Sequence, residues 1–120
     1  DTQTLTSKTL TNPTVTNYVE TQYNAPGTPT AYTVDLSQGT VHRVTTGGNI
    51  TITLPTNAAG KSYTVMIVYG GTHTVTWSAT NLKWPGGTVP STTSSSGKID
   101  IFSFFSDGTN TYGVAVGKNF

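Results

Sequence analysis

Apolar and polar residues alternate in short runs from residue 31 to the end of the chain, and such runs predict β-strands. Gly-Gly, Asp-Gly and proline turn signals separate the runs. No stretch of ten residues shows the 3.6-residue period of an amphipathic helix. The runs cover residues 32–36, 41–46, 50–54, 63–69, 73–78, 99–105 and 111–117. We therefore expect an all-β domain over residues 31–120.

Short strands at this spacing are typical of a β-sandwich or a barrel. Between these architectures we expect an antiparallel β-sandwich with a jelly-roll-like path. The clearest local signal is Gly70-Gly71, which separates two alternating runs by a few residues. That spacing predicts an antiparallel hairpin between residues 63–69 and 73–78.

The run from Ile99 to Phe105 is apolar on both faces of the predicted strand. Ile99, Ile101 and Phe105 share one face, whereas Phe102 and Phe104 share the other. A strand of this kind is covered on both sides, either inside a sandwich or at a subunit contact. We expect these five residues to be core and subunit contacts.

Residues 1–30 follow a different pattern and predict an extended arm. Residues 4–18 form the pentads TLTSK, TLTNP and TVTNY, in which Leu5, Leu10 and Val15 recur at every fifth position. In a flat strand this odd period turns successive apolar residues to opposite faces. Burying one aliphatic side chain gains about 1.5–3 kcal/mol, whereas ordering five residues costs about 1–2 kcal/mol each in backbone entropy. The arm is therefore either disordered or ordered by other chains, and we expect these three residues to be its anchoring contacts.

The Pro/Gly stretch over residues 25–29 reads as a linker between the arm and the β-domain. A pentapeptide-repeat β-helix is an alternative for the arm, because it has the same period. That fold needs a small residue two positions before each central apolar residue, where this chain has Gln3, Lys8 and Pro13. The extended arm is therefore favoured.

The composition excludes several classes of partner. Only 9% of the residues are charged, the formal net charge is +1, and the six Lys and Arg residues are scattered. The basic stripe of a nucleic-acid-binding protein is therefore missing. The chain has no cysteine, so disulfides and thiolate metal sites are excluded. The longest apolar run, residues 65–69, is far shorter than the about 20 residues that span a bilayer, so we expect no membrane insertion.

The sequence also shows no set of acids, bases or nucleophiles arranged as in a catalytic site, and we expect no enzymatic activity and no cofactor. No two of the five carboxylates are spaced to pair on one strand face. Asp107 precedes a glycine and predicts a turn. Asp100 shares a face with Phe102, so we expect it at an edge, hydrogen-bonded, or paired across an interface. His42 and His73 stand apart, as surface or edge residues do, and predict no metal site.

Several segments resemble a known class of protein. The stretch TLTSKTLTNPTV resembles the LTNKTLTNPT stretches of tailed-bacteriophage fibre and other virion proteins. The segments ITLPTNAAGKSYTVMIVYGGTHTVTW, KWPGGTVP and IDIFSFFSDGTNTYGVAVGKNF are similar to the terminal domain of phage tail-fibre and head-decoration proteins. The resemblance implies a trimer-forming or capsid-docked β-structure that is structural or adhesive, and it transfers no binding residues.

We therefore predict a virion structural protein of the capsid-decoration or cement type, which forms homotrimers on the outer surface of the phage particle. Its partners would be further copies of itself and the major capsid protein or the tail and fibre proteins. One alternative is the tip domain of a tail or head fibre, which attaches to the host. Another is a module that binds a host surface glycan, with Trp84 and Tyr69 as possible glycan contacts, and this alternative predicts that one of the two is exposed.

Overall fold

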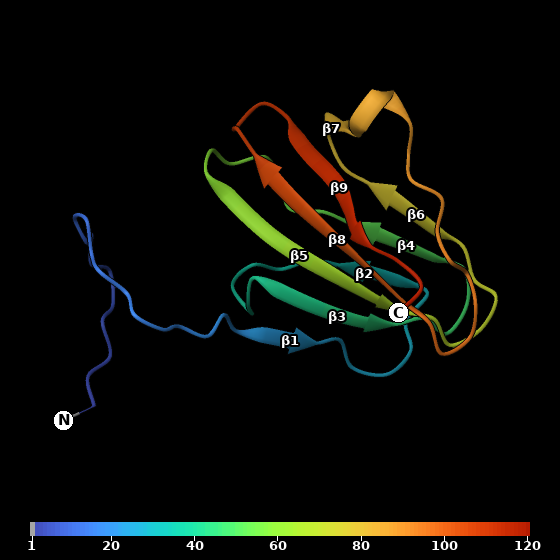
Figure 1. Cartoon of the computed structure of the whole chain (residues 1–120), viewed down its shortest axis with the longest axis horizontal. Coiled ribbons are helices and arrows are strands. Elements are labelled where there is room, and N and C mark those ends of the chain that lie inside the picture. Colours follow the sequence, from blue (N-terminus) through green and yellow to red (C-terminus); the bar gives the residue numbers. More distant parts are fainter. Residues whose placement is uncertain (1) are drawn as a thin grey trace.

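The computed structural model describes residues 2–120. These residues form β-strands and one 3-10 helix of three residues, so the expectation of an all-β domain is confirmed. Figure 1 shows the strands gathered in one body, from which the N-terminal residues extend to one side. The elements are β1 (Gln22–Asn24), β2 (Ala31–Thr33), β3 (Val41–Thr45), β4 (Ile50–Thr53), β5 (Lys61–Val68), β6 (Val75–Ser78), β7 (Leu82–Lys83), η1 (Pro85–Gly87), β8 (Ile99–Ser106) and β9 (Thr111–Gly117).

The strands form two sheets, and the chain alternates between them. One sheet has six strands in the order β1-β3-β5-β8-β9-β7, and the other has three in the order β2-β4-β6. Each of the strands β1 to β4 pairs in parallel with the strand two places later in the chain. This part of the chain therefore winds as a coil, and each turn adds one strand to each sheet.

The expectation of an antiparallel fold is wrong for this coil. Among the described strands, only β5 with β8 and β8 with β9 pair antiparallel. The coil therefore does not follow the antiparallel Greek-key path of a jelly roll. The hairpin expected across Gly70-Gly71 does not form either, because β6 pairs with β4 in the other sheet. Strand β5 has no free edge for β6, since β3 and β8 occupy its two sides.

Glycines mark two corners where successive turns of the coil touch. A Cβ atom added to Gly70 would lie 2.2 Å from the carbonyl oxygen of Thr46. One added to Gly47 would lie 2.3 Å from the carbonyl oxygen of Thr28. Real Cβ atoms do not approach backbone this closely, so the stacking of turns requires glycine at both corners.

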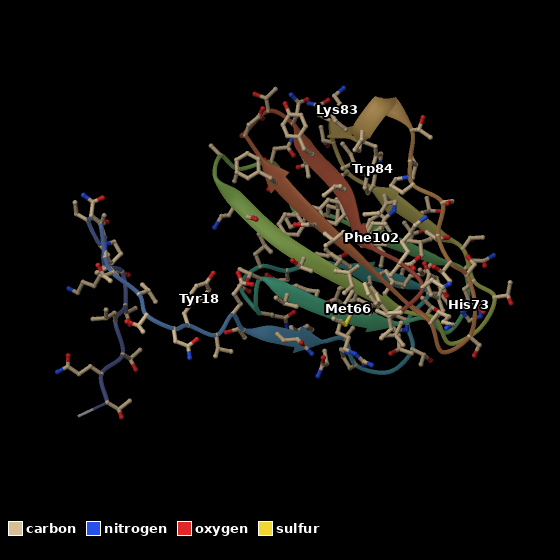
Figure 2. The ribbon with its side chains drawn as sticks, in the orientation of Figure 1. Tyr18, Met66, His73, Lys83, Trp84 and Phe102 are labelled. Carbon is tan, nitrogen blue, oxygen red and sulfur yellow. The ribbon has the colours of Figure 1, made fainter. Side chains whose placement is uncertain are left out.

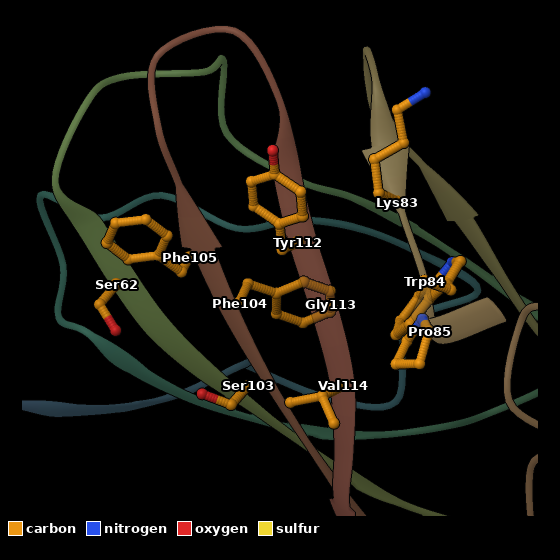
Figure 3. A pocket seen from close by; sticks show the side chains of 10 residues that line it. All are labelled: Ser62, Lys83, Trp84, Pro85, Ser103, Phe104, Phe105, Tyr112, Gly113 and Val114. Carbon is orange, nitrogen blue, oxygen red and sulfur yellow. The ribbon is translucent and has the colours of Figure 1, made fainter. Parts of the chain in front are cut away.

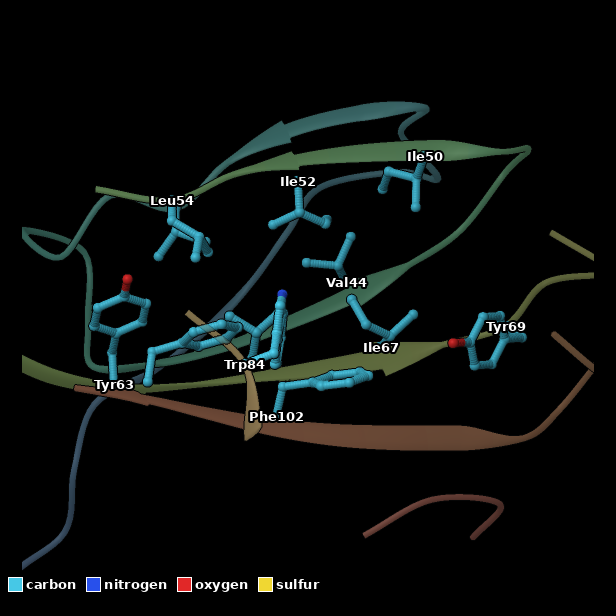
Figure 4. Close-up of a cluster of buried hydrophobic side chains, with 12 residues drawn as sticks. Val44, Ile50, Ile52, Leu54, Tyr63, Ile67, Tyr69, Trp84 and Phe102 are labelled. Carbon is cyan, nitrogen blue, oxygen red and sulfur yellow. The ribbon is translucent and has the colours of Figure 1, made fainter. Parts of the chain in front are cut away.

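The hydrophobic core lies between the two sheets. Figure 4 shows Ile50, Ile52 and Leu54 of the smaller sheet facing the larger one. The ring of Trp77 on β6 meets that of Phe102 on β8 at a centroid distance of 4.9 Å. The buried apolar residues are Val34, Val44, Ile50, Ile52, Leu54, Tyr63, Val65, Ile67, Tyr69, Trp84, Phe102 and Phe104.

The buried carboxylate of Asp100 ties the loop before β8 and the C-terminal segment to this core. It accepts hydrogen bonds from the Tyr69 hydroxyl at 2.9 Å, from the backbone N–H of Thr93 at 2.7 Å and from that of Asn119 at 3.0 Å. The hydroxyl of Thr93 donates a further bond. Burial raises the pKa of Asp100, but these hydrogen bonds outweigh it and hold the pKa below its ordinary value. Of the three settings expected for Asp100, the hydrogen-bonded one is present.

Candidate functional site

Strand β9 presents its large side chains to solvent and its small ones to the core. Tyr112, Val114 and Val116 are 45%, 46% and 63% exposed, whereas Gly113 is buried. A Cβ atom at Gly113 would lie only 2.6 Å from the ring of Trp84. The ring of Trp84 fills the space beneath β9, so only small residues fit on the inner side of this strand. Its large apolar residues therefore face solvent, whereas in most strands they face the core.

The neighbouring strand continues the exposed apolar surface. Phe105 on β8 is the direct partner of Tyr112 in the register and is 49% exposed. We call the surface formed by Phe105, Tyr112, Val114 and Val116 the β8–β9 face. None of these four residues is charged. An uncharged apolar sheet face of this kind marks a contact site more often than a solvated surface.

A groove runs over part of this face and reaches β7 and the start of η1. Its volume is about 480 Å³. Figure 3 shows the Phe105 and Tyr112 rings along it, with Trp84 and Pro85 on the other side of β9. The polar groups at its edge are the hydroxyls of Ser62 and Ser103 and the Lys83 side chain. Such a lining suits an apolar or aromatic ligand group.

The polar residues next to the face have structural partners. The Tyr112 hydroxyl donates to Oδ2 of Asp107 at 3.0 Å. Oδ1 of Asp107 accepts from the backbone N–H groups of Asn110 and Thr109, at 2.7 and 2.8 Å, and these bonds lower the pKa of Asp107. Asp107 is therefore a turn residue, as its sequence context predicts. Among residues 2–120, no group of three His, Asp or Glu side chains is placed to hold a metal ion.

The arm is the second exposed apolar feature. Leu5, Leu10 and Val15 are 64%, 59% and 56% exposed, and residues 2–20 form no strand. Ser7 and Asn12, at the same position of successive pentads, have φ angles of 53° and 47°. These left-handed residues break the alternation of a flat strand between one apolar residue and the next. Successive apolar residues of the arm therefore need not point to opposite sides, as they would in a flat strand.

The arm ends before the expected boundary at residue 30. Strand β1 pairs with β3 in the larger sheet, and the backbone N–H of Ala25 donates to the carbonyl of Arg43 at 2.9 Å. Among the described residues, the hydrogen bonds to the body begin at Thr21, whose carbonyl accepts from Val41. Figure 2 places Tyr18 on the extended part, away from the body.

The five residues singled out on β8 are divided between the core and the surface. Phe102 and Phe104 are buried, Ile99 and Ile101 are half-buried, and Phe105 is exposed. The residues divide between the two faces as the sequence pattern predicts, but within the single chain the outer face is not fully covered, because Phe105 is exposed. The exposed residues of β9 that sequence reasoning did not single out as contacts are Val114 and Val116. The signal for them was the set of small residues at the alternating positions of β9, namely Gly113, Ala115 and Gly117.

Both aromatic residues proposed as glycan contacts are buried. Tyr69 is 1% exposed and bonded to Asp100, and Trp84 is 9% exposed. Trp84 packs against Trp77 at a centroid distance of 5.8 Å, so its ring is held in the core and only lines the groove wall. The expectation that either residue is exposed is therefore wrong.

His42 also differs from expectation, because it is fully buried rather than at the surface. Its Nδ1 accepts a hydrogen bond from the Tyr32 hydroxyl at 2.6 Å, and its Nε2 donates to the carbonyl of Gly39 at 2.9 Å. Since a carbonyl only accepts, the neutral ring carries its proton on Nε2. His73 bonds separately to Thr46 at 2.8 Å.

Comparison with protein-family models, with curated proteins and with solved structures finds no match to this chain. The described residues contain no helix that is long and apolar enough to cross a membrane. The function is therefore argued from the arm, the β8–β9 face and the groove.

Proposed function

We propose that this protein is a structural subunit of a tailed-bacteriophage particle, a capsid-decoration or cement protein that forms homotrimers on the particle surface. The observation that carries the proposal is the joint presence of an exposed apolar arm and an exposed apolar sheet face in one chain. Both surfaces are typical of interaction sites, because large exposed apolar patches are uncommon on monomeric proteins.

The small number of charged residues and the structural role of the buried polar side chains support an assembly role. The chain carries few charges, and its buried carboxylate and buried histidine are each held by hydrogen bonds within the fold. The resemblance of its arm and of its C-terminal segments to phage virion proteins supports a place on the particle. In this proposal the arm contacts the capsid or a neighbouring copy, and the β-body forms the exposed knob.

Incorporation into particles tests the proposal. A tagged chain is produced in infected host cells, and the purified particles are examined for the tag by immunogold microscopy. We expect label over the head, lost when Leu5 and Leu10 are both changed to Asp. The matched control changes Thr6 and Thr9 to Asp, which adds the same charge and removes no apolar contact. Particles without label would contradict the proposal, and label at fibre ends would favour the fibre-tip alternative.

The paired Phe105 and Tyr112 rings favour a glycan-binding module as the second candidate function. They are the exposed aromatic residues of the groove, and Trp84 lies in its wall. A sugar bound there would change the fluorescence of Trp84. A panel of host surface glycans that leaves the tryptophan emission unchanged would count against this candidate, whereas a shift that is lost in Tyr112→Ala would support it.

A further inference from the structure

The exposed large apolar side chains fall into two groups on this molecule. Within residues 2–120 five of them lie on the arm and four form the β8–β9 face. The other two are Val89 and Phe120, and the ring of Phe120 lies against Gly117 at the end of β9. We propose that the arm of one copy packs on the β8–β9 face of a neighbouring copy. This inference rests on the proposed function, since it supplies the contact through which the copies associate.

The charges of the two surfaces are compatible with this contact. The four residues of the β8–β9 face are uncharged, and Lys8 and Glu20 are the charged side chains of residues 2–20. Among the residues that line the groove only Lys83 is charged, so a strongly charged partner would bury most of its own charges at a cost. The threonine-rich arm has no such cost, because its hydroxyls can stay in water or bond to Ser62 and Ser103 along the groove.

The apolar area is sufficient for a specific contact. The arm side chains are 56–92% exposed and those of the face are 45–63% exposed. We take about 150–200 Å² for each side chain, the lower part of the range for aromatic rings, because six of the nine are Leu or Val. Complete burial of the nine exposed parts would then cover roughly 1,000 Å², which is the lower limit for a biological interface. In a closed ring each copy gives one arm and receives one, so it takes part in two such contacts.

The path of the arm favours a neighbouring copy over the same chain. The arm leaves the body beside β1, which lies at the opposite edge of the larger sheet from β9, with β3, β5 and β8 in between. Figure 1 shows the arm extending away from the body and not across this sheet. The left-handed residues Ser7 and Asn12 bend it in the first and the second pentad, which lets it follow a curved surface.

A cross-linking experiment tests the contact, and the absence of native cysteine makes it clean. Chains carrying Leu10→Cys are mixed with isotope-labelled chains carrying Val114→Cys and oxidised. The control replaces Val114→Cys with Thr51→Cys, an exposed residue on β4 of the other sheet. We expect the Leu10–Val114 disulfide, identified by mass spectrometry, to form at least tenfold faster than the Leu10–Thr51 disulfide.

Other outcomes overturn the inference. Equal rates for the two pairs would show that the arm has no preference for the face. A double variant with both Leu10→Cys and Val114→Cys that closes within single chains at every concentration would place the arm on its own body. The mass of the same samples before oxidation separates the two proposals. Trimers without the Leu10–Val114 disulfide would remove the inference and leave the proposed function standing, whereas monomers would count against both.

Discussion

Phe105 and Tyr112 are direct neighbours across the β8–β9 pair, and both point away from the core. Beneath them, Phe104 and Trp84 fill the interior, with a centroid distance of 5.7 Å between their rings. The sheet thus carries aromatic residues on both of its faces at the same place. The inner layer stabilises the fold, and the outer layer is available for association.

Substitution on the two faces should therefore separate stability from association. We expect Val114→Asp to abolish self-association while changing the free energy of unfolding by about 1 kcal/mol or less, because the residue is half exposed. Phe104→Ala should cost about 3–5 kcal/mol of stability, because it leaves a cavity in the core. Urea unfolding and light scattering measure the two effects. Thr51→Asp is the control, and association lost in that variant as well would deny a special role to the face.

The corner glycines should be intolerant of any side chain. We expect Gly70→Ala to destabilise the fold by about 1–3 kcal/mol, because the new Cβ meets the backbone of Thr46 and the two turns must separate. At Gly48 an added Cβ meets only the side chain of Thr30, at 3.0 Å. Gly48→Ala should therefore have the smaller effect in thermal unfolding. Equal stability of the two variants would argue against tight stacking at the Gly70 corner.

The Asp100 network should make stability depend on pH in the acid range. Hydrogen bonds lower the pKa of Asp100 in the folded state below its ordinary value of 3.8. Its contribution is therefore complete above that value and is lost as the pH falls through the lower, folded pKa. We expect Asp100→Asn to cost about 1–3 kcal/mol at neutral pH, and the difference from the native chain should shrink in acid.

The control for this pH effect is Asp35→Asn. Asp35 is exposed, and in the described chain its carboxylate accepts hydrogen bonds from Ser37 alone. These bonds lower its pKa as well, but at an exposed site they contribute little to stability, so we expect Asp35→Asn to show a smaller pH dependence than Asp100→Asn. Urea unfolding between neutral pH and pH about 2 compares the three proteins. A constant difference between Asp100→Asn and the native chain over this range would contradict the assigned role of the carboxylate.

Two buried tyrosines should respond oppositely to the loss of their hydroxyl groups. The Tyr69 hydroxyl donates to Asp100 at 2.9 Å, whereas that of Tyr63 is buried without a hydrogen-bond partner among the described residues. We expect Tyr69→Phe to cost about 1.5–3 kcal/mol and Tyr63→Phe to be neutral or slightly stabilising. A loss of similar size in both variants, measured by urea unfolding, would show that Tyr63 has a partner as well.

Seven of the strands could be predicted from alternation, and so could the division of β8 into two faces, whereas the short strands β1 and β7 could not. Phe102 and Phe104 are inside, and Phe105 is outside. The pairing of the strands could not be predicted, because alternation does not reveal the partner of a strand. The run 73–78 has the same pattern whether it closes a hairpin on β5 or, as found, pairs in parallel with β4. The parallel pairing with β4 is decided by β3 and β8, which occupy both edges of β5 and leave no edge for a hairpin.

The proposed contact surfaces were accessible to sequence reasoning only in part. The pentads identify Leu5, Leu10 and Val15 as residues that need a partner, and the structure leaves them exposed. For Tyr112 and Val114, alternation gives two sets of residues but does not tell which set faces the core. That choice depends on Trp84, which is distant in sequence and fills the space under Gly113. The same long-range packing buries Trp84 and Tyr69, which removes them as glycan contacts.

The most direct measurement is the solution mass of two chains, by light scattering after size exclusion. One is the full chain and the other begins at Thr21, which removes the arm and keeps β1 with its hydrogen bonds to β3. We predict a trimer for the full chain and a monomer for the shortened one. A full chain that stays monomeric at all concentrations would contradict self-assembly through the arm and the β8–β9 face.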